Sequence, residues 1–103
     1  MIYFVDIDKT ICDYPDGIDV VGNYHRAIPN YHNIELINEL YRAGHIIVYW
    51  TARGMKTSRA AELYSLTASQ LMKWDCSYHE LRMGKPMYDR IIDDKALRIE
   101  ELE

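Results

Sequence analysis

The stretch 2–10 constrains the fold of this chain more than any other. It opens with apolar, aromatic and β-branched residues, a composition typical of a buried strand in a parallel sheet. Asp6 and Asp8 follow at once, and because side chains alternate along a strand they leave it on the same side. Ligands bind at the carboxyl edge of open α/β sheets, and two carboxylates held this close repel unless a cation compensates or one is protonated. The alternative, a strand that runs into a plain acidic turn, is equally compatible with these residues alone.

Two further apolar stretches end in polar side chains in the same way. Residues 46–50 predict a second buried strand, which leads into Thr51, and residues 90–92 predict a strand that leads into Asp93 and Asp94. Parallel strands joined by right-handed crossovers bring such ends to one edge of a sheet. The stretches therefore predict a common polar edge.

Helices are expected between these strands. Apolar residues recur at helical spacing over 34–41, and Gly44 falls where a glycine commonly ends a helix. A helical region follows from about residue 56, and the capping-box form of residues 67–70 indicates two short helices rather than one. A closing helix is expected over 97–102.

The resulting order, β-α-β-α-β-β-α, predicts one α/β domain over residues 1–103 with a small, mostly parallel sheet. A weak strand at 77–81 precedes the loop that carries Lys85. The predicted edge then gathers these side chains: Asp6, Asp8, Thr51, Lys85, Asp93 and Asp94. Four acids need a compensating cation, and oxygen ligands of this kind suit Mg²⁺.

Residues 11–30 form an irregular region. Turn signals flank the short apolar piece 18–21 and predict a small hairpin or flap. Tyr14, Tyr24 and Arg26 lie in this region, where packing in the core or on the surface is favoured over a place in a pocket.

Composition and charge narrow the function classes. The chain is 49% hydrophobic and 27% charged, with a net charge of −4 and a pI near 5.5. The absence of a basic run argues against a nucleic-acid partner. With no apolar run of spanning length and no signal-type leader, we expect a soluble cytoplasmic protein without a membrane partner. Cys12 and Cys76 have no metal-ligand spacing and are expected as free thiols.

Four motifs in order resemble those of the haloacid dehalogenase superfamily of phosphohydrolases: Asp6-x-Asp8-x-Thr10, Thr51, Lys85 and Asp93-Asp94. More narrowly, the segments 51–55, 84–86 and 92–96 look like those of small bacterial capsule-biosynthesis phosphatases, which act in polysaccharide synthesis. The resemblance implies a Rossmann-like three-layer sandwich. Neither 11–50 nor 52–84 has room for a folded cap domain, so the chain looks like a capless member.

The resemblance also implies roles for individual residues. Asp6 would attack phosphorus and carry a covalent aspartyl-phosphate, and Asp8 would act as general acid and then general base. Thr51 and nearby backbone amides, including that of Ala52, would hold the transferring oxygens, and Lys85 would offset their charge. The implied substrate is a small phosphorylated metabolite, most simply a sugar phosphate or a sugar-derived phosphate.

The resemblance implies a Mg²⁺ site as well. Its ligands would be Asp6, the backbone carbonyl of Asp8, and one of Asp93 and Asp94, with Asp94 favoured as the direct ligand. Arg53 is a candidate substrate contact, with a surface salt bridge as the equal alternative.

Taken singly, these residues have plainer interpretations: Thr51 as a helix cap, Lys85 as a surface lysine, and Asp93-Asp94 as turn or cap acids. Their joint order favours the phosphatase site. Lys9 departs from the family, which usually has Gly there, and a lysine costs free energy if the backbone requires φ > 0. Without a cap, the open site either admits a large substrate or borrows a lid from its own flap or from a neighbouring subunit of a homo-oligomer.

Three alternatives remain beside this hypothesis. A receiver domain uses similar residues, but its acidic pair comes first and its lysine last, an order that this chain does not have. A polynucleotide end-processing phosphatase would also need an open site, although the acidic charge balance counts against it. A non-catalytic phosphate-binding module is disfavoured by the intact set of motifs.

Overall fold

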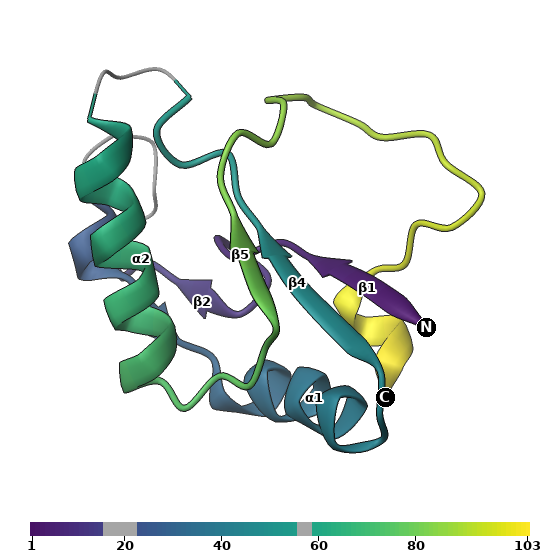
Figure 1. The fold of residues 1–103 in the computed structure, drawn as a ribbon. Helices are drawn as coiled ribbons and strands as arrows, with labels where there is room; N and C mark the ends of the chain where they lie inside the picture. The colour runs from purple at the N-terminus through teal and green to yellow at the C-terminus, as the bar shows by residue number, and fades with distance from the viewer. Residues whose placement is uncertain (16–22, 56–58) are drawn as a thin grey trace.

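The protein is described here by a computed structural model, which covers residues 1–15, 23–55 and 59–103 (Figure 1). Its centre is a parallel sheet in the order β1-β4-β5, made by β1 (Ile2–Val5), β4 (Ile46–Trp50) and β5 (Glu80–Arg82). Helix α1 (Tyr31–Arg42) lies in the connection from β1 to β4, and α2 (Ala60–Lys73) connects β4 to β5. The predicted α/β class and parallel sheet are confirmed.

The register aligns the carboxyl ends of the three strands. Val5 lies opposite Tyr49, and Tyr49 lies opposite Leu81. The backbone amide of Thr51, just past β4, donates to the carbonyl of Arg82 at 3.0 Å. The residues that follow each strand therefore emerge side by side, as right-handed parallel connections require.

One face of the sheet carries the core. Val5, Ile47, Tyr49 and Leu81 alternate onto this face and are buried. The helices add Ile34 and Ile37 from α1 and Leu71 from α2, at the spacing of a helical apolar stripe. Burial of this shared surface is what holds both helices to the sheet.

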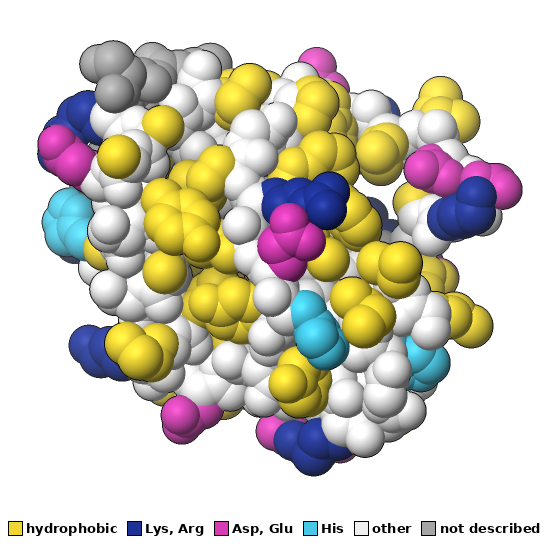
Figure 2. Space-filling view, in the orientation of Figure 1, with side chains coloured by type: hydrophobic (Ala, Val, Ile, Leu, Met, Phe, Trp, Pro, Cys, Tyr) yellow, Lys and Arg dark blue, Asp and Glu magenta, His cyan; other side chains and the backbone are white. Residues whose placement is uncertain are grey.

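The other face is largely exposed. Ile2, Phe4 and Ile46 are 66%, 50% and 40% exposed, and Figure 2 shows hydrophobic side chains gathered over β1 and β4. The Phe4 ring meets the Trp50 ring edge-on at a centroid distance of 5.5 Å. Within the described part of the chain, both α-helices pack on the face of the sheet that carries the core, since both contribute residues to the same core cluster.

The predicted end of α1 before Gly44 is confirmed, but the predicted break within the second helical region is not. Asn30 caps α1 by accepting from the amide of Asn33, and Gly44 follows the helix with φ 97°, as expected of a terminating glycine. The predicted division of the second helical region at 67–70 is wrong, because α2 runs unbroken from Ala60 to Lys73. The Thr67 hydroxyl instead donates to the carbonyl of Leu63 one turn earlier.

The region 11–30 contains a small antiparallel pair and a short helix. Strand β2 (Cys12–Asp13) pairs with β3 (Ile28–Pro29), and the 3₁₀-helix η1 (Tyr24–Arg26) precedes β3. The hairpin predicted around 18–21 lies outside the described residues. The described ends of this region are nonetheless fastened together, since the amide of Asn30 donates to the carbonyl of Ile11 at 2.8 Å.

The C-terminal segment differs from the prediction. Residues 90–92 form no strand, and Ile91 and Ile92 are 54% and 99% exposed. After β5 the chain leaves the sheet in a wide loop and returns beside β1 (Figure 1). The expected closing helix is the short 3₁₀-helix η2 (Ile99–Leu102), whose apolar ends pack against the core. A strand is stable only when a neighbour takes its hydrogen bonds and a face is buried, and residues 90–92 have neither.

Among the described residues, no helix is long and apolar enough to cross a membrane.

Candidate active site

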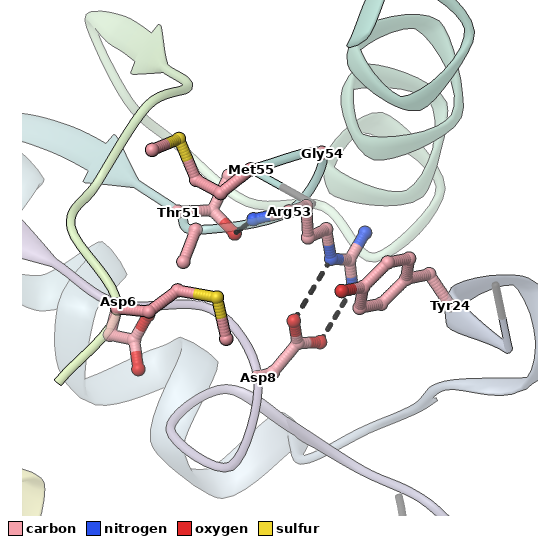
Figure 3. A pocket seen from close by; sticks show the side chains of 9 residues that line it. Asp6, Asp8, Tyr24, Thr51, Arg53, Gly54 and Met55 are labelled. Carbon is pink, nitrogen blue, oxygen red and sulfur yellow. Dashed lines mark hydrogen bonds and ion pairs between the residues drawn. The ribbon is translucent and has the colours of Figure 1, made fainter. Parts of the chain in front are cut away.

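A pocket of about 170 Å³ opens at the carboxyl ends of β1 and β4 (Figure 3). Its lining comes from the turn after β1, the loop after β4, η1 and the segment after β5. The lining residues are Asp6, Asp8, Tyr24, Thr51, Ala52, Arg53, Gly54, Met55 and Met87. The predicted edge of the sheet is thus hollowed, and Asp6, Asp8 and Thr51 lie together there.

A tight turn after β1 presents the two acids. Ile7 and Ile11 are fully buried and anchor the turn, and the amide of Ile11 donates to the carbonyl of Ile7 at 2.9 Å. Lys9 has φ 64°, so the backbone at this position does adopt the left-handed conformation that favours glycine. The alternation of side chains sends Ile7 into the core and both acids to the pocket.

Lys85 approaches Asp6 from the loop after β5. Its Nζ lies 3.5 Å from Asp6 Oδ1, and its amide donates to the carbonyl of Thr51 at 3.0 Å. The lysine side chain is only 12% exposed, so the surface-lysine alternative is wrong. Burial raises the pKa of Asp6, while the charge of Lys85 acts in the opposite direction.

Thr51 is buried at the end of β4, with 1% of its surface exposed. Its hydroxyl accepts from the amide of Arg53 at 3.1 Å and closes the turn that leads away from the strand. The helix-cap alternative is wrong, because α2 begins only at Ala60.

Arg53 is neither on the surface nor directed at solvent. It is 1% exposed, and its guanidinium forms a bidentate ion pair with Asp8, from Nη2 to Oδ1 at 2.8 Å and from Nε to Oδ2 at 3.1 Å. Figure 3 shows the Asp8 carboxylate turned toward this guanidinium. The surface-salt-bridge alternative is therefore wrong, and the partner of Arg53 is one of the two predicted catalytic acids.

Two further side chains bind Asp8. The Tyr14 hydroxyl donates to Asp8 Oδ1 at 2.5 Å, and the Cys12 thiol lies 3.5 Å from the same oxygen. Burial, with the Asp8 charge adding to it, raises the pKa of the Cys12 thiol to about 12 and raises the pKa of Tyr14 as well. Both groups therefore keep their protons near neutral pH. Cys12 and Cys76 are free, as expected.

The favoured packing interpretation for the tyrosines of the 11–30 region is also corrected. Tyr24 lines the pocket, and its ring lies 4.8 Å from the Arg53 guanidinium carbon. Tyr14 reaches Asp8, whereas Arg26 is exposed and is not part of the pocket lining. The β2–β3 pair, whose strands flank these tyrosines in the sequence, is joined to the turn after β1 by the bridge between Asp8 and Cys12.

Sequence reasoning missed four other residues of the site. Met55 and Met87 form part of the pocket wall; Met55 ends the segment 51–55 that carries the resemblance but was given no role there, and no pattern marks Met87. Thr67 and Gln70 of α2 accept hydrogen bonds from Arg53 Nη1 at 3.0 and 2.6 Å. Thr67 and Gln70 lie three residues apart on the buried face of α2, a spacing that could have indicated a buried polar partner. From the sequence alone, these residues are instead interpreted as part of a capping box.

Asp93 and Asp94 lie apart from the pocket. Asp93 Oδ1 accepts from the amide of Lys95 at 2.9 Å, and the Asp94 side chain, 84% exposed, lies 3.8 Å from Lys95 Nζ. Neither residue lines the pocket. The expectation that they join the polar edge is wrong for this structure, because the strand at 90–92 that would carry them there is not formed.

The pocket residues do not by themselves compose the expected Mg²⁺ site. Of the expected ligands, Asp6 is paired with Lys85, and Asp93 and Asp94 are absent from the pocket lining. In residues 1–15, 23–55 and 59–103, no group of three or more acidic, histidine or cysteine side chains could hold a metal ion. Asp6 and Asp8 are instead compensated by two cations of the chain itself.

Comparison with known proteins supports the fold. No protein-family model matches the chain, and no curated protein matches its sequence. A structural-genomics target from Vibrio cholerae, solved by crystallography, is similar over 98% of this chain and 85% of its own, with a TM-score of 0.83 and 27% sequence identity. The chain is thus a small α/β domain with a solved structural counterpart.

Proposed function

We propose that this chain is a phosphomonoester hydrolase of the haloacid dehalogenase type, in its capless form, that works through an aspartyl-phosphate. One observation carries the proposal: Asp6 faces the pocket with Lys85 3.5 Å away and with a second acid, Asp8, in the same lining. A carboxylate nucleophile, a cation for the phosphoryl charge and a neighbouring acid–base group are the parts that such a reaction needs.

In the proposed reaction, a carboxylate oxygen of Asp6 attacks phosphorus and the ester P–O bond breaks. Asp8 enters this step protonated and gives its proton to the departing oxygen, which leaves as an alcohol; the carboxylate that remains is the form that Arg53 pairs with. Asp8 then takes a proton from water, whose oxygen attacks phosphorus. The bond from phosphorus to Asp6 breaks, and orthophosphate and the free carboxylate are released.

Lys85 and Thr51 support these steps. The ammonium group of Lys85 offsets charge on the transferring phosphoryl group, and it opposes the rise in the pKa of Asp6 that partial burial causes. The loop that begins at Thr51 lines the pocket with Ala52, Arg53 and Gly54, and we propose that backbone amides of this loop hold the phosphoryl oxygens.

The size of the pocket bears on the substrate class. Its volume of about 170 Å³ is below the roughly 300–1,000 Å³ of sites that enclose a drug-sized ligand. It suits a phosphoryl group with the rest of the substrate at the mouth, beside Tyr24, Met55 and Met87. We propose a small phosphorylated metabolite such as a sugar phosphate, with capsule or polysaccharide synthesis as the setting.

The sequence adds the hypothesis that Mg²⁺ takes part, held by Asp6, the backbone carbonyl of Asp8 and Asp93 or Asp94. The pocket residues alone do not fit that site, so the steps above use only groups of the chain.

The test is release of inorganic phosphate from a panel of esters: sugar phosphates, nucleotides, a 3′-phosphorylated oligonucleotide and an aryl phosphate. Each is assayed with Mg²⁺ and with EDTA. We expect Asp6→Asn to lower the rate by at least about 10³-fold while the melting temperature stays close to that of the wild type, because only the nucleophile's charge is lost.

Asp75→Asn is the matched control. Asp75 is exposed after α2 and has φ 57°, a conformation that asparagine tolerates, so this variant should keep full activity. Wild-type rates in Asp6→Asn would refute the mechanism. Preference for the oligonucleotide would favour a polynucleotide phosphatase, and phosphate binding without turnover would favour a binding module.

A further inference from the structure

Arg53 is the most completely hydrogen-bonded side chain in the pocket wall. A guanidinium has five N–H donors, and each of the five has an acceptor here. Nε and Nη2 donate to the two oxygens of Asp8, and Nη2 also lies 3.4 Å from the Tyr14 hydroxyl. Nη1 donates to Thr67 and Gln70 of α2. The side chain thus joins the turn after β1 to the helix that follows β4.

The same geometry argues against the substrate contact that the sequence offered as one role for Arg53. A guanidinium that binds a phosphoryl group must turn two N–H donors toward the anion. All five donors of Arg53 are already directed at protein acceptors, and its side chain has no exposed surface. Binding substrate would mean giving up the pair with Asp8, which would leave a partly buried carboxylate without its compensating charge.

The Tyr24 ring and Gln70 fix the guanidinium further. The Tyr24 ring covers the group at 4.8 Å, and Gln70 donates to the Tyr24 carbonyl at 2.7 Å while it accepts from Arg53. Figure 3 shows the ring beside the guanidinium and Asp8 turned toward it. The orientation of Asp8 is therefore set by a rigid group, itself held from two sides.

We propose that Arg53 is a positioning residue that holds the Asp8 carboxylate in one orientation at the pocket, and that it does not bind the substrate. The inference rests on the proposed function, in which Asp8 gives its proton to the departing oxygen. A proton donor misplaced by a fraction of an ångström loses much of its effect. Lysine cannot replace arginine in this role, because an ammonium group offers no planar pair of donors.

The test compares kcat/KM for an alkyl phosphate and for p-nitrophenyl phosphate. An alkoxide is a poor leaving group and needs the proton from Asp8, whereas nitrophenolate departs readily without one. We expect Arg53→Lys to lower kcat/KM about 100-fold for the alkyl ester and about 10-fold or less for the aryl ester, the same direction as Asp8→Asn.

Arg82→Lys is the matched control. Arg82 forms a similar two-nitrogen pair with Glu80, but this pair is exposed and outside the pocket. We expect this variant to leave kcat/KM unchanged for both esters. Tyr14→Phe removes only the hydroxyl that binds Asp8, and it should show the same ester preference with a smaller loss, even if Arg53→Lys proves too unstable to assay.

A double-mutant cycle separates positioning from a direct role. If Arg53 acts through Asp8, adding Arg53→Lys to Asp8→Asn should lower kcat/KM by no more than about threefold further. Losses that multiply, or an equal rise in KM for both esters, would overturn the proposal in favour of a substrate contact.

Failure of the proposed function has a different signature. It would appear as full activity in Asp6→Asn or as no phosphate release by the wild type, and in either case the role of Arg53 falls with it. An active wild type, an inactive Asp6→Asn and an equal loss on both esters in Arg53→Lys and Tyr14→Phe would overturn the inference about Arg53 alone.

Discussion

At the scale of single residues, the site pairs each acid with a different cation. Asp6 lies near Lys85, whose ammonium is a compact point charge, and Asp8 is held by the planar fork of Arg53. The flexible lysine ammonium can stay close to a phosphoryl group as that group moves, whereas the planar arginine guanidinium fixes the orientation of the carboxylate it binds. The two pairs thus match the two roles proposed for the acids, a nucleophile and a positioned proton carrier.

The first prediction concerns Lys85→Met, which keeps the length of the side chain and removes its charge. Loss of the charge should lower kcat/KM by roughly 10²–10³-fold. Burial raises the pKa of Asp6 and Lys85 opposes that effect, so removing Lys85 raises this pKa further. In the proposed reaction Asp6 attacks only as the carboxylate, so the acid limb of the pH profile should move to higher pH. An unshifted limb would contradict the pairing.

The second prediction concerns Lys9, a non-glycine residue at φ 64°. A left-handed conformation costs an L-residue roughly 1–2 kcal/mol, and glycine recovers most of this while losing some chain entropy. Lys9→Gly should therefore raise the free energy of unfolding by about 0.5–1 kcal/mol in urea titrations. Lys9→Ala, which keeps the backbone strain, is the control and should give no such gain.

At the scale of elements, the sheet has one buried and one exposed face. Neighbouring residues of β4 report on the two faces, since Ile47 is fully buried and Ile46 is 40% exposed. Parallel sheets usually have both faces covered. The exposed face of β1 and β4 is thus an unusual feature of this domain, and it follows from the absence of helical cover there in the described residues.

The third prediction uses this pair of residues. Ile47→Ala should lower the free energy of unfolding by about 2–5 kcal/mol, because it opens a cavity in the core. Ile46→Ala should cost less than about 1 kcal/mol, because the side chain is already partly in water. Equal costs in chemical denaturation would mean that the outer face is covered in solution.

At the scale of the whole molecule, the charged and hydroxyl groups of the site come from three segments that are distant in sequence. The turn after β1 supplies the acids, the loop after β4 supplies Thr51 and Arg53, and the loop after β5 supplies Lys85. A fourth segment, 93–94, was expected and lies elsewhere. The Mg²⁺ hypothesis therefore depends on how the chain beyond β5 is arranged.

The fourth prediction tests that hypothesis. EDTA should stop phosphate release, and added Mg²⁺ should restore it; Asp94→Asn should raise the Mg²⁺ concentration needed for half-maximal activity by at least about tenfold. Asp89→Asn, an exposed acid of the same segment, is the control and should behave as the wild type. Full activity of Asp94→Asn at low Mg²⁺ would remove Asp94 from the set of ligands.

The sequence by itself determined the parallel sheet, the first helix with its terminating glycine, and the meeting of Asp6, Asp8 and Thr51 at one edge. These features follow from local patterns: apolar runs, alternation of side chains and the handedness of crossovers. To place Lys85 near Asp6, the order of the strands in the sheet had to be known in addition to these local patterns. Local rules suffice where one element and its neighbours decide the outcome.

Tertiary structure alone decided the burial and hydrogen-bond partners of Arg53, Thr67 and Gln70 and the positions of Asp93 and Asp94. A buried guanidinium needs acceptors from several segments at once, and no local pattern encodes which segments those are. Residues 90–92 have a strand-like composition, yet a strand forms only against a partner that shares its hydrogen bonds. Both outcomes depend on contacts between distant parts of the chain, and the folded molecule supplies those contacts.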